Sequence, residues 1–302
     1  MIAVVATVLA AVALGVAAHR RAAGRAERAA QRVLDAMLYV IGPPVVFLLL
    51  TRVEIDVDVG VGILLAHIAL VITGALAYLA SRGQDRAARG AMIVGAIQVN
   101  TGYFGLPLTA ALFGSDALPV AVAYDTLVQL PMLLLGVFAI GAAFGDRAGS
   151  GTRERAGAFL RRNPSLLAAP AGLLAPDAVA PDVLVDAARV AVFAQLPLGF
   201  FAVGVALAAD ADAPGLRLLA APDRAVTIVL GLRLLVMPAL LLALAAPLID
   251  LPDEYLLLAA CPTGIGALIV AHAYGLPVRI VVPAIVWSTA IVCAVAAATV
   301  IV

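Results

Sequence analysis

Long apolar runs separated by short polar stretches follow one another along the whole chain. Each run is bounded by charged residues or by proline and glycine, and most are long enough for a helix to cross the roughly 30 Å hydrocarbon layer of a bilayer. The pattern predicts an all-α integral membrane protein with ten transmembrane helices. The predicted spans cover residues 2–18, 33–51, 60–80, 90–113, 117–144, 164–180, 183–208, 223–249, 254–275 and 278–302.

The composition supports a membrane protein without a separate soluble domain. Hydrophobic residues make up 64% of the 302 residues and charged residues only 13%, whereas soluble domains are about half apolar and about a quarter charged. Ten spans of about 20 residues each leave enough chain only for short loops. The net charge of zero creates no field that would attract nucleic acid or another polyanion.

Arginine is concentrated in alternate loops, which sets the predicted orientation. Positive residues near span ends stay on the cytoplasmic side, and arginines follow the first, third, fifth, seventh and ninth spans, so both termini are predicted outside. These arginines are Arg20, Arg21, Arg25, Arg28, Arg32, Arg82, Arg86, Arg89, Arg147, Arg153, Arg155, Arg161, Arg162, Arg217, Arg224 and Arg279. The opposite loops carry Glu54, Asp56, Asp58, Asp116, Asp177, Asp182, Asp250, Asp253 and Glu254, with Arg52 as their only arginine.

The alternation of charge continues across the sixth span, which contains or borders Pro170, Pro176 and Pro181. We therefore expect that span to cross as a short or bent helix.

Two predicted spans are interrupted near their middles, and each is the fourth span of a five-span half. The fourth span reads Gln98-Val-Asn-Thr-Gly-Tyr-Phe-Gly-Leu-Pro107, and the ninth reads Cys261-Pro-Thr-Gly-Ile-Gly266. Because five is odd, a second copy enters the membrane from the opposite side, and the pattern predicts an inverted five-plus-five repeat. The predicted segments are a first repeat at 1–144, a short cytoplasmic linker at 145–163 and a second repeat at 164–302.

The two interruptions predict a binding site near the bilayer centre. Irregular backbone in hydrocarbon persists only where it lines a cavity or packs against protein, and an inverted repeat would make the two broken helices cross there. Free N–H groups at the N-terminal ends of the half-helices attract a carboxylate, and Asn100, Thr101 and Thr263 would add side-chain donors. The simpler alternative is that glycine and proline only bend these spans.

Further polar residues lie inside the predicted spans. Asp125 is a candidate carrier of a proton or a cation, because burying an ionised carboxylate in a membrane is unfavourable by about 3 kcal/mol or more. The alternative for Asp125 is an interior hydrogen bond that fixes helix packing. Gln129 shares its helix face and would continue a polar track, with Gln98 as a third coupling candidate. Arg233 would either balance a substrate carboxylate or extend to the cytoplasmic edge.

Other reactive residue types predict no second site. Cys261, Cys293 and three dispersed histidines form no metal-binding spacing. No nucleophile and base can be assembled, so neither an enzyme nor a cofactor is expected. Asp186 and Arg189 are spaced to form a structural ion pair along one helix.

The segment Asn100-Thr-Gly-Tyr-Phe-Gly-Leu-Pro107 resembles the Asn-x-Gly-x-x-Gly-x-Pro signature of the auxin efflux carrier superfamily, including its bacterial members. The similarity extends over nearly the whole chain. It includes Asn163-Pro164, the Pro197 region, Arg233 to Pro238, and Pro262-Thr263 through Tyr274-Gly275.

The resemblance implies a scaffold domain, a transport domain with crossed broken helices, and elevator-like alternating access in a bacterial inner (plasma) membrane. Bacterial relatives are associated with malate, malonate and other small organic anions. The implied substrate site comprises Asn100, Thr101, Gly102, Pro107, Pro262, Thr263 and Gly264. In it, Asn100 would contact the substrate, and Pro107 and Pro262 would mark the crossover. This chain has Cys261-Pro262-Thr263 where plant carriers have an asparagine near the second break, and it lacks their long cytoplasmic loop.

The sequence therefore predicts a secondary transporter of small organic anions that is coupled to a proton or sodium gradient. Its expected partners are the anion, the coupling ion and the lipid bilayer, with a homodimer left open. The alternative is a membrane receptor that binds a ligand without moving it.

Overall fold

The structure, a computed structural model of the whole chain, describes residues 2–51, 60–176, 179–211 and 222–301. Every regular element within these ranges is helical, and an isolated β-bridge joins two helix interruptions. The predicted all-α membrane fold is confirmed for these residues.

The helices differ widely in length, and α1, α3, α10 and α15 are the longest. The α-helices are α1 (Ile2–Asp35), α2 (Gly42–Leu50), α3 (Gly60–Ala80), α4 (Arg86–Ile97), α5 (Leu106–Phe113), α6 (Leu118–Tyr124), α7 (Phe138–Phe144), α8 (Thr152–Arg161), α9 (Ser165–Leu174), α10 (Asp182–Ala211), α11 (Arg224–Gly231), α12 (Met237–Ala245), α13 (Asp253–Ala259), α14 (Gly266–Tyr274) and α15 (Val278–Ile301). The π-helical segments are η1 (Ala36–Ile41), η3 (Thr101–Gly105), η5 (Asp125–Gln129), η6 (Met132–Val137) and η9 (Leu232–Val236). Two 3₁₀ turns are η4 (Ser115–Ala117) and η7 (Asp146–Ala148).

The chain divides into two compact units, and each takes helices from both halves of the sequence. One unit contains α1, α2, α8, α9 and α10, and the other contains α3 to α7 together with α11 to α15. One boundary between the units, after Asp146, lies close to the predicted end of the first repeat at residue 144, and the extent of the two repeats remains a prediction. The predicted linker, 145–163, contains η7 and α8.

Six helices in the described part of the chain are long and apolar enough to cross a membrane. They are Ala6–Leu50, Gly60–Ala80, Val120–Phe144, Asp182–Ala209, Arg224–Ala245 and Val278–Ala296. The number differs from the predicted ten for three reasons. The fourth and ninth spans are each divided into short helices, the first two are merged into one 45-residue stretch, and α9, in place of the sixth, has only 10 residues, which is about 15 Å of helix. Ten crossings and the inverted repeat remain predictions.

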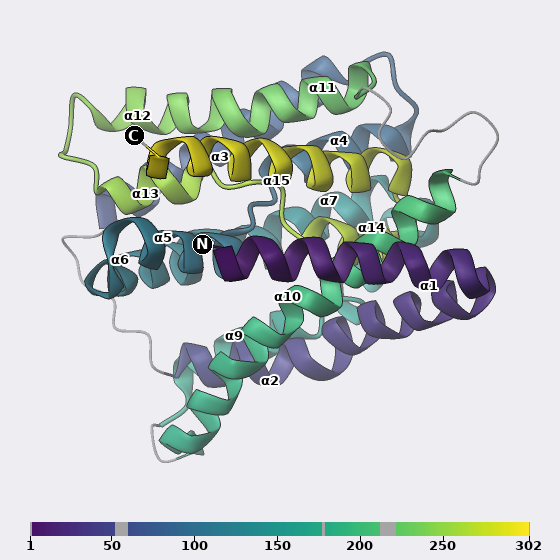
Figure 1. Cartoon of the computed structure of the whole chain (residues 1–302), viewed down its shortest axis with the longest axis horizontal. Coiled ribbons are helices and arrows are strands. Elements are labelled where there is room, and N and C mark those ends of the chain that lie inside the picture. Colours follow the sequence, from purple (N-terminus) through teal and green to yellow (C-terminus); the bar gives the residue numbers. More distant parts are fainter. Residues whose placement is uncertain (1, 52–59, 177–178, 212–221, 302) are drawn as a thin grey trace. The chain divides into compact units, whose positions relative to one another are not determined.

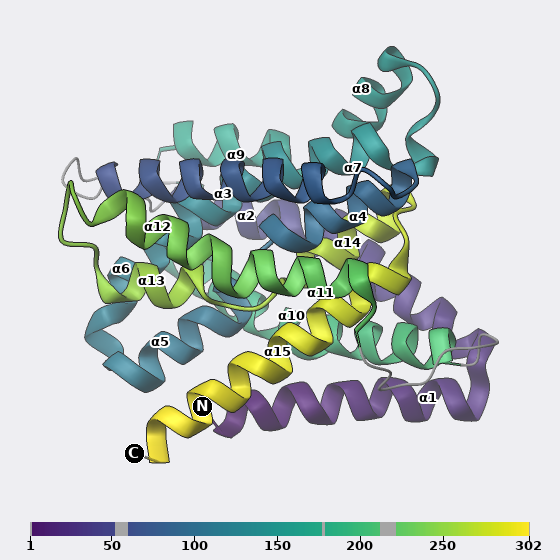
Figure 2. The same ribbon diagram turned by 90° about the horizontal axis from the view of Figure 1, so that it is seen from above.

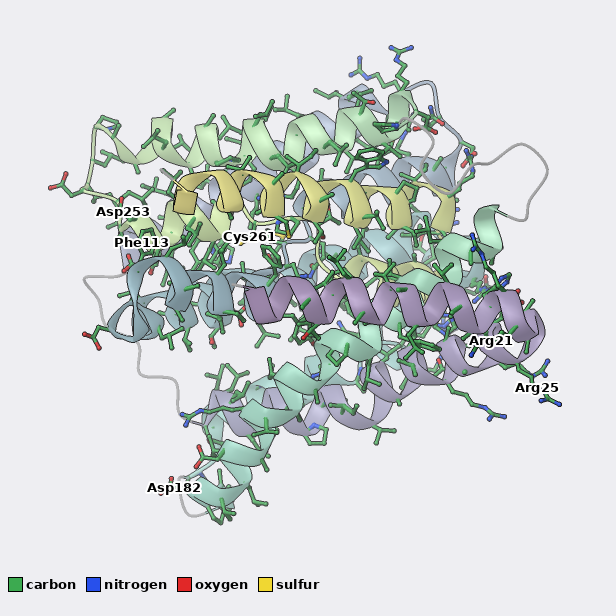
Figure 3. All side chains as sticks on the ribbon, viewed as in Figure 1. Arg21, Arg25, Phe113, Asp182, Asp253 and Cys261 are labelled. Atoms are coloured by element: carbon green, nitrogen blue, oxygen red, sulfur yellow. The ribbon has the colours of Figure 1, made fainter. Side chains whose placement is uncertain are left out.

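The first two predicted spans are joined by helix and not by a loop. Backbone dihedral angles in α1 depart from helical values at Ala22 (φ −158°, ψ 69°), and the chain turns back on itself at that end of α1 (Figure 1). The expected loop at residues 19–32 is therefore wrong, because both sides of the bend are helical. Arg21 and Arg25 are exposed close to this bend (Figure 3).

Charged residues mark the two ends of the unit that contains α1 and α10. Arg21 and Arg25 lie at one end of this unit, and Asp182, which begins α10, lies at its other end (Figure 3). The predicted ion pair between Arg189 and Asp186 is confirmed, with 2.9 Å between guanidinium nitrogen and carboxylate oxygen. Other residues of the charge pattern lie outside the described residues, namely Arg52, Glu54, Asp56, Asp58, Asp177 and Arg217.

Glycines allow α1 and α10 to pack with their backbones in close approach. A Cβ atom at Gly204 would lie 2.2 Å from the carbonyl oxygen of Val12, and a Cβ atom at Gly15 would lie 2.3 Å from that of Phe201. Small residues at such contacts are a common means of helix association in membranes. Helix α10 crosses α1 obliquely in Figure 1 and lies next to it in Figure 2.

The second unit is built around α4, whose residues from Ala87 to Ile97 are almost all buried. Helices α3, α7, α11 and α15 pack around it. Asp85 caps α4 by accepting a hydrogen bond of 2.8 Å from the N–H of Ala88, and Asp223 caps α11 in the same way through Val226. The buried α4 ends at Ile97, in the interior of this unit.

Replacing Gly204 by alanine tests the contact between α1 and α10. We expect Gly204→Ala to lower the free energy of unfolding by roughly 1–3 kcal/mol, because the added methyl group overlaps the backbone of Val12. Gly231→Ala is the matched control, since a Cβ atom there meets no atom within 4 Å, and it should be neutral or stabilising by about 0.5–1 kcal/mol. Thermal unfolding in detergent measures both, and equal effects of the two substitutions would contradict the close approach.

Candidate substrate site at the helix crossing

Two helices of the second unit are interrupted in their middles. Helix α4 ends at Ile97 and η3 begins at Thr101, whereas α13 ends at Ala259 and α14 begins at Gly266. Gln98 has extended dihedral angles (φ −83°, ψ 111°). In the second interruption, Pro262 lacks a backbone N–H and disfavours helical geometry in the preceding residue. Both interruptions predicted from the sequence are present.

The two interruptions cross and pair through their backbones. The N–H of Asn100 donates to the carbonyl of Pro262, and the N–H of Gly264 donates to the carbonyl of Gln98, each at 2.9 Å. Val99 lies opposite Thr263 in this short antiparallel bridge. The pairing satisfies polar groups that would otherwise be unsatisfied within hydrocarbon at several kcal/mol each.

Glycine is required at one point of the crossing. A Cβ atom at Gly264 would lie 2.6 Å from the carbonyl oxygen of Val99 and 3.1 Å from the nitrogen of Asn100. Pro262 takes part in the crossing as predicted, but Pro107 does not mark it. Pro107 lies in the first turn of α5, beyond the whole of η3, because the chain leaves helical geometry at Gln98 and has already re-entered it at Thr101.

Thr263 holds the crossing to its neighbours. Its side chain is fully buried, its hydroxyl donates to the carbonyl of Gly95 at 2.9 Å, and its N–H donates to the hydroxyl of Ser288 at 3.0 Å. The hydroxyl predicted as a donor to substrate is therefore bonded to the end of α4. Ser288 was not predicted, because a serine in the apolar run of α15 has no distinctive sequence pattern.

Arg233 is fully buried in η9 and binds the carboxyl ends of both interrupted helices. Its guanidinium group donates to the carbonyl of Ala96 at 3.2 Å and to the carbonyl of Ala259. The last carbonyls of a helix lack intrahelical partners and carry partial negative charge, which a guanidinium group compensates. Of the two alternatives for Arg233, extension to the cytoplasmic edge is wrong, because the side chain is fully buried and two of its donors are bonded to protein carbonyls.

Asn100 carries a buried amide group without a protein partner. The residue is only 2% exposed, and neither its side-chain nitrogen nor its oxygen has a hydrogen-bond partner among the described residues. An unpaired buried polar group is unfavourable by about 1–3 kcal/mol. The amide is therefore available to a ligand at the crossing.

Asp125 lies against the first turn after the first interruption. Its carboxylate accepts a hydrogen bond from the hydroxyl of Thr101, and a Cβ atom at Gly102 would lie 3.2 Å from it. This bond matches the alternative in which Asp125 fixes helix packing. A role of Asp125 as an ion carrier remains a prediction.

The two glutamines bind one another next to the crossing. The amide nitrogen of Gln129 donates to the side-chain oxygen of Gln98 at 2.8 Å, and each residue is 4% exposed. The side-chain oxygen of Gln129 has no partner among the described residues. Gln129 therefore links η5 to the interruption of α4, in addition to sharing a helix with Asp125.

Two tyrosines close to the crossing were not predicted. The rings of Tyr124 and Tyr255 meet edge to face with 5.0 Å between their centroids. Both residues are buried, and neither hydroxyl has a partner among the residues described. Tyr124 directly precedes Asp125, and this adjacency is the only sequence feature that could have placed either tyrosine near the crossing.

Comparison with known proteins gives one informative similarity. No family model matches the chain. A protein of Methanothermobacter thermautotrophicus (strain Delta H), named as an uncharacterized transporter, is 32% identical over 174 residues, which cover 55% of this chain and 52% of that relative. The chain thus spans about half the length of the relative. The long apolar helices of the described residues support a multi-pass membrane protein.

Substitutions of Thr263 test whether its hydroxyl holds the crossing together. We expect Thr263→Val to lower the free energy of unfolding by about 1–3 kcal/mol, because the carbonyl of Gly95 loses a buried partner. Thr263→Ser keeps the hydroxyl and should retain most of the stability. Thr73→Val is the control, because the Thr73 hydroxyl donates only within its own helix, to Ala69 at 2.7 Å. Thermal unfolding without ligand is the measurement, and equal loss in the valine and serine variants at position 263 would refute the role.

Proposed function

We propose that the chain is a secondary transporter of small organic anions, which bind at the crossing of the two interrupted helices. The observation that carries the proposal is the Asn100 amide, which is buried at the crossing with both polar atoms unpartnered. Its N–H₂ group can donate to a carboxylate. The half-helices that begin at Thr101 and Gly266 add backbone N–H groups with partial positive charge.

Residues around the crossing take different roles in this proposal. Asn100 contacts the substrate, while Gly264 and Pro262 maintain the backbone pairing that exposes the half-helix ends. Asp125 carries the coupling ion from its position beside Thr101 and Gly102. Thr263 and Arg233 contribute by holding the helix ends.

The motif of the fourth span supports assignment to the auxin efflux carrier superfamily as part of the proposal. In that scheme the unit with the crossing is the transport domain and the unit with α1 and α10 is the scaffold domain. Alternating access would be elevator-like, with ten crossings in an inverted repeat and both termini outside a bacterial inner membrane. Cys261-Pro262-Thr263 replaces the second asparagine of plant members, so a single asparagine side chain serves the substrate here.

Transport is tested with purified protein in liposomes. We expect uptake of labelled mono- or dicarboxylates when a proton or sodium gradient is imposed, and exchange of internal for external anion in counterflow. Saturable binding without counterflow would identify a receptor instead. Failure of every carboxylate to bind or move would refute the proposal.

Asn100→Ala tests the site itself. We expect it to weaken binding of a transported carboxylate by about 1–3 kcal/mol, because a buried donor is lost. Gln195→Ala is the matched control, since Gln195 is also a buried amide but lies on α10 in the other unit. Direct binding assays in detergent should show the control unchanged, and an unchanged affinity of the Asn100 variant would remove Asn100 from the site.

A further inference from the structure

Two charged side chains lie close to the crossing, and they are not paired with one another. Arg233 is fully buried and is bonded to two backbone carbonyls, and Asp125 is partly buried and is bonded to the hydroxyl of Thr101. Among the ion pairs of the described residues, none includes either group. Each charge is thus held by neutral partners.

The charge on Arg233 is constant, whereas the charge on Asp125 can change. A guanidinium group does not lose its proton in proteins. Two of the Arg233 donors are bonded to the carbonyls of Ala96 and Ala259, and its Nε has no partner among the described residues. The partial charges of the half-helix ends cancel, because two amino ends and two carboxyl ends meet at the crossing. The protonation state of Asp125 therefore decides whether the crossing carries a net charge of zero or of plus one.

Neutral groups surround Asp125 on the elements that pack against it. Thr101 and Tyr103 come from η3, Tyr124 precedes Asp125 on its own helix, and Cys261 comes from the second interruption. His67 on the neighbouring α3 has one ring nitrogen bound to the carbonyl of Ile63 at 2.9 Å. Tyrosine and cysteine are ordinarily uncharged at neutral pH, so the three tyrosine and cysteine side chains supply no second compensating charge.

We infer that the crossing binds an anion with a single negative charge together with one proton, with Asp125 holding the proton and Arg233 acting as the tethered counter-ion. The inference rests on the proposed function and adds the charge of the substrate and the identity of the coupling ion. With Asp125 protonated, a monoanion brings the net charge of the crossing to zero. With Asp125 ionised, the same anion would leave an uncompensated buried charge, which is unfavourable by several kcal/mol.

The position of Arg233 also argues against a metal ion as the coupling cation at the helix ends. A sodium ion that compensated the carboxyl ends of α4 and α13 would need the carbonyl oxygens of their last turns. Arg233 already donates to two of these, at Ala96 and Ala259. The only proton acceptor with a formal charge at the crossing, within the described ranges, is Asp125.

Proton uptake during binding is the direct test. Purified protein in detergent is titrated with acetate, lactate, malonate and succinate in two buffers of different ionisation enthalpy, and the difference in heat gives the protons taken up per anion. We expect about one proton per bound monocarboxylate and an affinity that falls by about tenfold per pH unit once Asp125 is ionised in the free protein.

Asp125→Asn, neutral at every pH, should bind with an affinity that does not vary with pH and should take up no proton. Asp116→Asn, which changes an exposed carboxylate, should behave as the unmodified protein.

A second comparison tests Arg233 as an electrostatic positioning residue. We expect Arg233→Gln to weaken binding of lactate by about tenfold or more but to change binding of the neutral analogue lactamide much less. Arg233→Lys keeps the charge and should restore preference for the anion. Arg224→Gln, at an exposed residue of the same span, is the control. A purely structural role would weaken binding of the two analogues equally, and that result would overturn the assignment of Arg233.

The possible results separate the two proposals. Carboxylate binding that requires sodium, or binding without proton uptake, would overturn this inference and leave the anion transporter in place. Tighter binding of the dicarboxylates at all pH values would also overturn it. Absence of any carboxylate binding to the unmodified protein would refute the proposed function, and the inference would fail with it.

Discussion

The two backbone hydrogen bonds between the interruptions of α4 and α13 are the interaction on which the second unit depends. They pair Asn100 with Pro262 and Gly264 with Gln98. Hydrocarbon offers no water to an open backbone, so an interrupted helix is stable only when another backbone or a side chain satisfies it. Each interruption supplies the partners for the other, and neither would be stable alone. The absence of a side chain at Gly264 and the bonds of Thr263 to Gly95 and Ser288 follow from this requirement.

The same requirement explains why a charged residue is buried in η9. The carbonyls of Ala96 and Ala259 belong to the last turns of two helices that end inside the protein. Water would satisfy such groups at a protein surface. Here the fork of one guanidinium group reaches both helix ends, and a charged donor makes stronger bonds than a neutral one. Arg233 binds only the carboxyl ends, and the Asn100 amide is left without a partner among the described residues.

The sequence predicted the features that depend on local composition. Apolar runs identified α3, α10, α11 to α12 and α15, because hydrophobicity over about 20 residues is sufficient to recognise a span. Glycine and proline identified both interruptions, because their backbone restrictions act locally.

Features that depend on distant partners were not predictable from the sequence. The carbonyls bound by Thr263 and Arg233 lie 168 and 137 residues away along the chain, and a backbone carbonyl has no residue type that could mark it. The bend in α1 falls at Ala22, and alanine, unlike glycine or proline, does not mark a bend in the sequence. Its arginine-rich surroundings therefore indicated a loop, although the chain there is helical.

The π-helical segments make the polar interior sensitive to the length of the chain. Asp125 begins η5 and Arg233 lies within η9, and such segments arise where one extra residue is accommodated in a helix. In a regular α-helix each residue turns the helix by about 100°. Loss of a single residue from either segment would therefore rotate one part of the span against the other. Asp125 would then lose the Thr101 hydroxyl, or Arg233 would lose the carbonyls of Ala96 and Ala259. Related chains should accordingly tolerate many apolar exchanges on these spans but few insertions or deletions within them.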